Sequence, residues 1–136
     1  MNRVMGTLIQ YYSKDAVSKA VVLVGDTIVT AVIMVSLSNN SRLVAGSRVS
    51  VVFKESETAI AYLLPSGVIS IRNRLPCTVI AVDDDCILAS VTMDFLGNRI
   101  ESLITSESAS ELCLRPGKSV FALIKSTEVM IEKSDP

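Results

Sequence analysis

The chain has 136 residues, a hydrophobic content of 49%, few aromatic residues (4%) and a formal net charge of −1. These values fit one ordinary globular domain or two small ones, and they exclude a whole-protein field that would attract nucleic acid or anionic membrane. Histidine is absent, so the commonest general base and the commonest transition-metal ligand are both missing.

The first half of the chain predicts five β-strands. Its apolar residues are mainly Val, Ile, Leu and Ala, and the β-branched members of this set favour strands. The segment "LLPSG" that follows predicts a linker, and we place the linker at residues 63–69. The predicted strands are Val4–Tyr12, Ala16–Val24, Ile28–Val35, Ser47–Phe53 and Thr58–Tyr62.

The second half predicts five more strands and one helical turn. Turns are expected at Asp83–Asp85, Leu96–Asn98 and Arg115–Gly117. The acidic triplet is interpreted as a hairpin turn, because no EF-hand spacing follows it. Residues 106–112 are the only candidate helical piece, since hydroxyl residues stand at their start. The strands are Leu75–Val82, Ile87–Asp94, Ile100–Thr105, Ser119–Ile124 and Val129–Lys133.

The two halves are repeats of one unit. Shifting the sequence by 71 residues aligns residues 2–60 with the second half at 11 identical positions, where composition alone gives roughly three or four. The matches include a turn glycine (Gly46 and Gly117) and a lysine (Lys54 and Lys125). We therefore expect a copy at residues 1–62 and a second copy at 70–136.

Five strands with a short helical turn between the third and fourth predict an OB-like barrel. The expected fold is all-β, with two tandem OB-like five-stranded Greek-key barrels. A barrel of this size has a thin core and several open edges, so association with further copies of the chain is expected.

The expected location is the cytoplasm. The start of the chain lacks the apolar core and cleavage site of a signal peptide, and the longest apolar run, Ile28–Leu37, is too short to span a bilayer. Cys77, Cys86 and Cys113 form no C-x-x-C pair, and we expect all three to be buried reduced thiols.

Three pieces of the second copy carry more polar groups than strands and turns require. They offer a guanidinium, an ammonium and several hydroxyls, with Glu107 as the one carboxylate within them. Each also has a plain structural interpretation: a polar linker turn, a helix cap and a solvated strand-end lysine. The residues are Ser70, Arg72 and Asn73 in the first piece, Thr105 and Ser108 in the second, and Lys125 and Ser126 in the third.

Such a set of donors suits a small tetrahedral dianion. Arg and Lys neutralise charge, and hydroxyls and amides supply directed hydrogen bonds. Phosphate near neutral pH retains a proton that needs an acceptor, whereas molybdate, tungstate and sulfate do not. The three pieces therefore predict a site for a fully deprotonated oxyanion.

The motifs "SIRNRLPCTV" and "LITSESASELCLRPGKSVFALIKSTEVMI" resemble the Mop, or molbindin, domain, which is related to the TOBE domains of molybdate transporters. The resemblance is close over residues 70–131 and weak in the first copy. Two tandem copies are similar to the di-Mop proteins, which store or buffer molybdate in the cytoplasm. The resemblance implies one OB-like barrel per copy, assembly into trimers, and oxyanion sites between copies or subunits.

The same resemblance places the serine and arginine of the first family motif on Ser70 and Arg72. The hydroxyls of the second motif fall on Thr105 and Ser108, and the lysine and its successor fall on Lys125 and Ser126. Backbone amides of these pieces are implied as further donors.

The chain departs from the family pattern in several places. Ile71 replaces an alanine and is expected to narrow the site, and Cys77 replaces a glycine. The first copy has no Ser-x-Arg piece before Asn2, and its counterparts of Thr105, Ser108 and Ser126 are Met34, Leu37 and Glu55. We therefore expect Lys54 to mark at most a weakened secondary site.

The expected function is binding of molybdate or tungstate for storage and homeostasis, with the oxyanion as ligand and no other cofactor. The alternative is the ligand-sensing C-terminal domain of a molybdate-responsive transcriptional regulator, and a purely structural pair of barrels is a third possibility. No helix-turn-helix is present, so the chain as given is not expected to bind DNA. Base stacking by Tyr11 and Tyr12 has little support without a basic surface. An enzyme is not expected, because the sequence lacks histidine, a nucleophile elbow and a glycine-rich phosphate loop.

Overall fold

The alternation of apolar and polar residues produces the strands that it predicts. In the computed structural model, which describes residues 1–34, 43–63 and 67–133, every second residue of Val17–Val24 and of Leu88–Phe95 is buried. One face of each strand therefore packs inward and the other faces out. No helix among the described residues is long and apolar enough to cross a membrane.

The first copy contributes five strands and a 3-10 turn, in the places where strands were predicted. They are β1 (Asn2–Lys14), β2 (Val17–Val24), β3 (Thr27–Ile33), β4 (Arg48–Phe53), η1 (Glu55–Glu57) and β5 (Ala59–Ala61).

The second copy repeats this order and adds the predicted helical turn. Its elements are β6 (Asn73–Asp84), β7 (Leu88–Phe95), β8 (Asn98–Thr105), α1 (Ser106–Glu111), β9 (Ser119–Ile124), η2 (Ser126–Glu128) and β10 (Met130–Lys133). The counterpart of α1 in the first copy falls on residues 35–40, which lie outside the described part of the chain.

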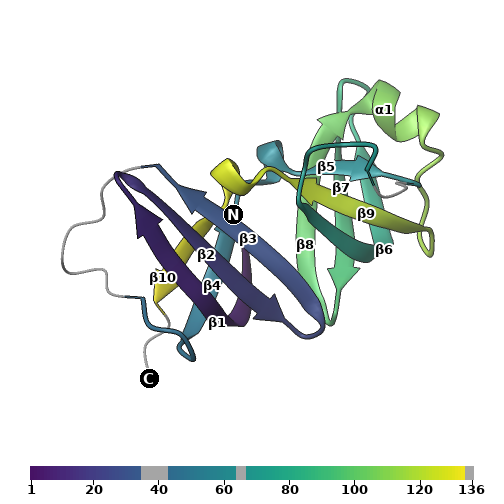
Figure 1. Cartoon of the computed structure of the whole chain (residues 1–136). Coiled ribbons are helices and arrows are strands. Elements are labelled where there is room, and N and C mark those ends of the chain that lie inside the picture. The colour runs from purple at the N-terminus through teal and green to yellow at the C-terminus, as the bar shows by residue number, and fades with distance from the viewer. Residues whose placement is uncertain (35–42, 64–66, 134–136) are drawn as a thin grey trace.

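Each copy forms an antiparallel Greek key. The strand orders are β10-β4-β1-β2-β3 in the first sheet and β5-β9-β6-β7-β8 in the second. In each sheet the fourth strand of a copy returns to lie beside its first strand, which is the Greek-key arrangement. The predicted all-β class and the two OB-like five-stranded barrels are confirmed, and the barrels lie side by side in Figure 1.

The two barrels exchange their fifth strands. β5 of the first copy pairs with β9 of the second, and β10 of the second pairs with β4 of the first. The registers are equivalent, since Ile60 lies opposite Ala122 and Ile131 lies opposite Val51. Figure 1 shows both crossings at the junction, next to η1 and η2. We had expected residues 1–62 and residues 70–136 each to supply all five strands of one barrel. Instead, each barrel takes four strands from one copy and its fifth strand from the other.

The similarity of the copies explains the exchange. β5 and β10 carry an isoleucine at matching positions and make matching ladders, so each occupies the equivalent place in the barrel of the other copy. Exchange of an equivalent element keeps the ladder contacts and joins the two bodies. Alternation along a strand predicts that the strand exists, but it does not identify the partner strand.

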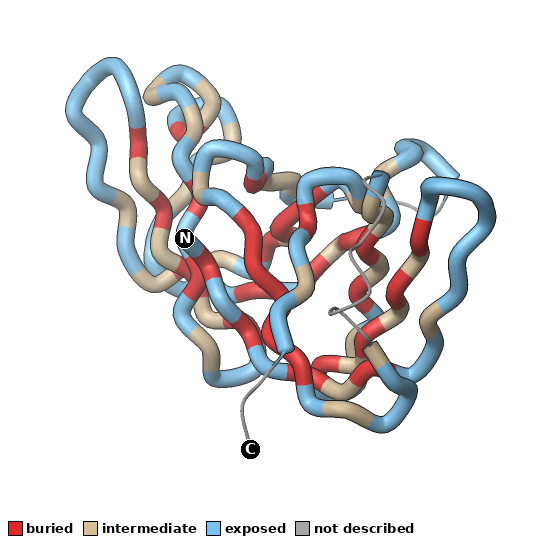
Figure 2. The backbone as a smooth tube through the Cα atoms, turned by 90° about the vertical axis from the view of Figure 1, so that its left-hand side faces the viewer, coloured by how far each residue is buried: buried red, intermediate tan, exposed pale blue. Residues whose placement is uncertain are grey.

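The core is continuous across the two copies. One cluster of buried apolar residues includes Val4, Leu8 and Phe53 of the first copy and Leu75 and Phe95 of the second. Figure 2 shows the buried stretches along the inner sides of both barrels. Further contacts cross the junction, where η1 packs on β8 and η2 packs on β3.

A lysine links the exchanged strand β5 to the end of α1. The Nζ of Lys118 lies 4.2 Å from the ring centroid of Tyr62, which directly follows β5. The same ammonium donates a hydrogen bond to the carbonyl of Leu112, at the C-terminal end of α1. A cation at this end of a helix satisfies a carbonyl that has no partner within the helix.

The cysteines differ from the expectation. Cys77 is buried, and burial raises the pKa of its thiol to about 12. Cys86 and Cys113 are exposed, so the prediction of three buried thiols is wrong for these two. Both have left-handed backbone, with φ of 77° and 51°, and stand at a hairpin turn and at the end of α1. Turn geometry rather than hydrophobicity places them at the surface.

The hairpin turn near the acidic triplet lies at residues 85–87, slightly beyond the predicted Asp83–Asp85, because Asp83 and Asp84 still pair with β7. The Asp85 carboxylate accepts hydrogen bonds from the N–H groups of Leu88 (2.7 Å) and Ile87 (2.9 Å), and these bonds lower its pKa. Asp84 accepts in the same way from the Cys86 N–H. Such side-chain bonds to the backbone two or three residues on are typical of Asp in turns.

Candidate functional site

The first and third polar pieces meet at one end of the second sheet. Asn73 is the first residue of β6 and lies opposite Ile124, the last residue of β9. Arg72 and Lys125 are the next residues outward on these neighbouring antiparallel strands, so their backbones lie side by side. Both side chains are exposed. Two cations, followed along the chain by the hydroxyl of Ser126, therefore mark this strand end.

A pocket of about 280 Å³ lies beside this strand end and includes residues within or next to the three pieces. Ile71 comes from the first piece, Ile104 precedes Thr105 of the second, and Lys125 belongs to the third. Lys125 is the one predicted binding residue that lines the pocket itself. Arg72 and Thr105 are not among the residues that line it. Ile71 lies in the pocket wall, and the narrowing expected of its side chain stays a prediction.

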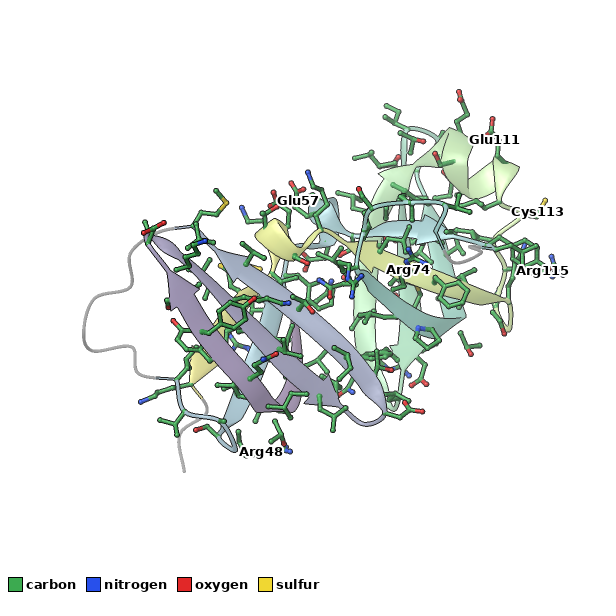
Figure 3. The ribbon with its side chains drawn as sticks, in the orientation of Figure 1. Arg48, Glu57, Arg74, Glu111, Cys113 and Arg115 are labelled. Atoms are coloured by element: carbon green, nitrogen blue, oxygen red, sulfur yellow. The ribbon has the colours of Figure 1, made fainter. Side chains whose placement is uncertain are left out.

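The pocket also contains carboxylates that were not expected. Glu57 of η1 and Glu128 of η2 line it together with Lys125, so its ionisable side chains sum to a net charge of −1. Figure 3 shows Glu57 at the junction between the barrels, far from Glu111, Cys113 and Arg115 at the outer end of the second copy. The prediction of a donor-only pocket is therefore wrong for its interior. Because the strand exchange brings Glu57 in from the first copy, no local pattern in the second copy could have revealed it.

The second piece forms a helix cap. The Thr105 Oγ1 accepts a hydrogen bond from the Ser108 N–H at 3.1 Å and lies 2.9 Å from the Ser108 Oγ, to which it donates. This confirms the capping interpretation and leaves the proton of the Ser108 hydroxyl available to a further acceptor. The neighbouring Ser106 hydroxyl donates to the Asp84 carboxylate at 3.0 Å.

Asn73 makes contacts that its place in the motif did not predict. Its side chain is 1% exposed and pairs with the backbone of Thr30 in the first copy. The Asn73 amide therefore belongs to the junction between the copies rather than to the predicted set of oxyanion donors. Ser70 is exposed and precedes the first strand, as the linker interpretation expects.

The equivalent end of the first copy is different in charge and in donors. Lys54 is exposed at the end of β4, as Lys125 is at the end of β9. Glu55 takes the place of Ser126 and forms an ion pair with the Met1 ammonium, which lowers the pKa of Glu55. Met34, the counterpart of Thr105, is 62% exposed and offers no hydroxyl. Leu37 lies outside the described residues.

The fold places the chain among proteins with two OB-type barrels in tandem. Residues 69–131 match the model of the TOBE domain. The chain is 41% identical over 64 residues to molybdenum-pterin-binding protein 1 of Clostridium pasteurianum, a match that covers 46% of this chain and 94% of that protein. The chain belongs to the Mop family of TOBE-domain proteins, with two copies in tandem.

Two further comparisons extend over more of the chain. MopB of Rhodobacter capsulatus, named as a molybdenum-pterin-binding protein, is 36% identical over 103 residues, which cover 75% of this chain and 38% of MopB. The chain thus spans well under half the length of that relative. The structure of the cytoplasmic molybdate-binding protein ModG, with molybdate bound, matches with a TM-score of 0.90 at 27% identity, over 98% of this chain and 96% of ModG.

Proposed function

We propose that this chain binds molybdate or tungstate at the end of the second sheet where Arg72, Lys125 and Ser126 lie side by side. The observation that carries this proposal is the strand pairing that brings the first and third polar pieces to one strand end, beside a pocket lined by Lys125. Membership of the Mop family and the overall match to ModG support the choice of ligand.

The oxyanion sits at the mouth of the pocket and not inside it. The interior holds Glu57 and Glu128 against one lysine, so a dianion there meets net repulsion. At the mouth, Arg72 adds a second cation and Ser126 adds a hydroxyl. The Ser108 hydroxyl, fixed by Thr105, supplies a further donor.

One chain supplies too few donors to pair every oxygen of a dianion, and an unpaired buried charge is costly. We therefore propose that a neighbouring copy completes the site in a homo-oligomer, for which a trimer is our expectation. The proposed role is non-enzymatic storage and buffering of the oxyanion in the cytoplasm, with no other cofactor. Sensing within a transcriptional regulator is the alternative role, and no feature of the described residues favours it.

Thermal unfolding of the full chain with different oxyanions tests the proposed function. At a molybdate or tungstate concentration of about 100 times Kd, ligand binding stabilises the native state by about 2.7 kcal/mol, which raises Tm by roughly 5–10 °C. Phosphate at the same concentration is expected to leave Tm within about 1 °C. An equal rise with phosphate would contradict the proposal, because it would mean that a carboxylate of the site accepts the phosphate proton. No rise with any oxyanion would refute it.

A further inference from the structure

Two buried asparagines join the two copies by the same hydrogen bonds. The Asn73 Nδ2 donates to the Thr30 carbonyl and the Asn73 Oδ1 accepts from the Thr30 N–H, both at 2.8 Å. The Asn2 side chain makes the same two bonds, also at 2.8 Å, with the backbone of Glu101. Asn2 and Asn73 are 71 residues apart, as are Thr30 and Glu101, so the two contacts are counterparts in the repeat.

Each asparagine pairs with an edge strand of the other copy. Thr30 lies on β3 and Glu101 on β8, the last strands of their sheets. An edge strand leaves alternate N–H and C=O groups without a ladder partner, and such groups need partners when they are buried. A side-chain amide carries one donor group and one acceptor, like a peptide group. Each asparagine side chain therefore pairs with the edge strand in the way that a residue of a neighbouring strand would. Asn2 and Asn73 are 4% and 1% exposed, so both side-chain amides are shielded from water on the asparagine side of these bonds.

The Asn73 contact bears directly on the proposed oxyanion site. The ladder between β6 and β9 begins at Asn73. Arg72 comes just before this first paired residue, so no ladder hydrogen bond holds the Arg72 backbone. On the other side of Arg72, the Ile71 carbonyl accepts a hydrogen bond from the Arg74 Nε at 3.0 Å, so Asn73 is the fixed point on the strand side of Arg72. The same residue lies opposite Ile124, which precedes Lys125. The Asn73–Thr30 bonds therefore fix the position from which both cations extend.

The Asn2 contact provides a natural control. It holds Glu101, four residues before Thr105, and β8 is held along its length by its own ladder with β7, which reaches Thr105. Loss of the Asn2 bonds leaves that ladder in place. No arginine with the role of Arg72 precedes Asn2 in the repeat. The two asparagines therefore make the same hydrogen bonds between the copies, but only Asn73 lies next to the predicted oxyanion donors.

We propose that Asn73 is a positioning residue for oxyanion binding, which fixes Arg72 and Lys125 by docking the start of β6 on the edge strand β3 of the other copy. This inference rests on the proposed function. In this proposal Asn73 does not contact the ligand, and Asn2 only holds the two copies together.

The test compares N73A and N2A in the full chain, by thermal unfolding without ligand and by molybdate titration well below Tm. Each variant leaves an edge N–H and C=O buried without a partner, so both are expected to lower Tm by a similar amount, roughly 5–10 °C. N73A is expected to weaken molybdate binding about 10-fold, and N2A less than about 3-fold.

The outcomes separate the inference from the function on which it rests. A wild-type chain that binds no molybdate refutes the proposed function, and the positioning role with it. A wild-type chain that binds, with N73A and N2A losing affinity alike or not at all, refutes the positioning role alone. An unchanged Tm in N73A, with affinity lost, shows that Asn73 contacts the ligand and also refutes the inference.

N73D supplies a second readout that does not depend on the ligand. A protonated carboxyl group at this position accepts from the Thr30 N–H and donates to the Thr30 carbonyl, as the amide does, whereas the ionised form repels that carbonyl. The pKa of this carboxyl group in the folded state therefore lies above its unfolded value of about 3.9. Its stabilising contribution is complete below that value and is lost as pH rises through the folded pKa.

The ligand-free Tm of N73D relative to wild type is thus expected to recover on acidification from pH 7 to about pH 4. Taking the difference cancels the titration of groups that both proteins share. A difference in Tm that stays constant over this range would contradict the paired geometry. Arg72 and Arg74 flank this position along the chain, Lys125 follows its ladder partner Ile124, and Glu128 lies on η2, which packs on β3.

Discussion

Lys125→Ala is expected to weaken molybdate binding by about 10- to 100-fold, whereas Lys54→Ala changes it by less than about 3-fold. A hydrogen bond to a charged partner contributes about 1.5–3 kcal/mol, and each 1.4 kcal/mol is a factor of ten in affinity. Lys125 follows Ile124, the ladder partner of Asn73, and lines the pocket at this strand end. Lys54 is its counterpart in the repeat, but Glu55 and Met34 replace the neighbouring hydroxyl residues.

Titration calorimetry on the two variants measures this difference. Both lysines are exposed and neither forms an ion pair among the described residues, so the ligand-free Tm is expected to stay near the wild-type value in both. Lys125→Arg keeps the charge but changes its geometry, and we expect it to retain part of the affinity. Equal losses in Lys125→Ala and Lys54→Ala would contradict the asymmetry assigned to the two copies.

Phe95→Ala is expected to destabilise the whole chain by about 3–5 kcal/mol and to lower Tm by about 10–20 °C. Phe95 is 0% exposed and belongs to the core cluster that runs through both copies. Truncation leaves a cavity in close-packed surroundings, and the neighbouring side chains fill it only in part.

The strand exchange is expected to make the two barrels of Phe95→Ala unfold together in one thermal transition. Unfolding of the second copy removes β10 from the first sheet, and unfolding of the first copy removes β5 from the second sheet. Neither barrel keeps five strands without the other. Scanning calorimetry of Phe95→Ala is therefore expected to show one transition at lower temperature, as in the wild type.

Phe121→Ala is the matched control, because it makes the same substitution at a phenylalanine that is only half-buried. Phe121 lies on β9 between buried neighbours and is itself half-buried, so its truncation leaves no enclosed cavity and is expected to cost about 1–2 kcal/mol. Two separate transitions in Phe95→Ala, with one at the wild-type temperature, would show that the barrels unfold independently and would contradict the role of the exchange.

Local features of the fold could be predicted from the sequence because their causes are local. Period-two alternation defines the strands, and a glycine with φ of 87° forms the predicted turn at Leu96–Asn98. The hydroxyl of Thr105 begins α1 in the way that capping predicts. The 71-residue repeat also indicated correctly that both halves share one architecture.

Features that depend on distant partners could not be predicted in this way. The two fifth strands occupy equivalent places in the repeat, so their exchange between barrels left no local signal. Glu57 enters the pocket of Lys125 only through that exchange. Asn73 belongs to a motif that resembles a ligand site, yet its amide pairs with Thr30, 43 residues away along the chain. The same pairing of Asn2 with Glu101 shows how the repeat distributes structural and binding roles differently in its two copies.

The most direct test of the account is to locate the oxyanion in crystals grown with molybdate or tungstate, by the anomalous scattering of the metal. We predict a peak within hydrogen-bonding distance of Lys125 and Arg72, completed by donors of a neighbouring copy, and no peak of comparable height beside Lys54. A peak beside Lys54 with none beside Lys125, or a metal site remote from both strand ends, would contradict it.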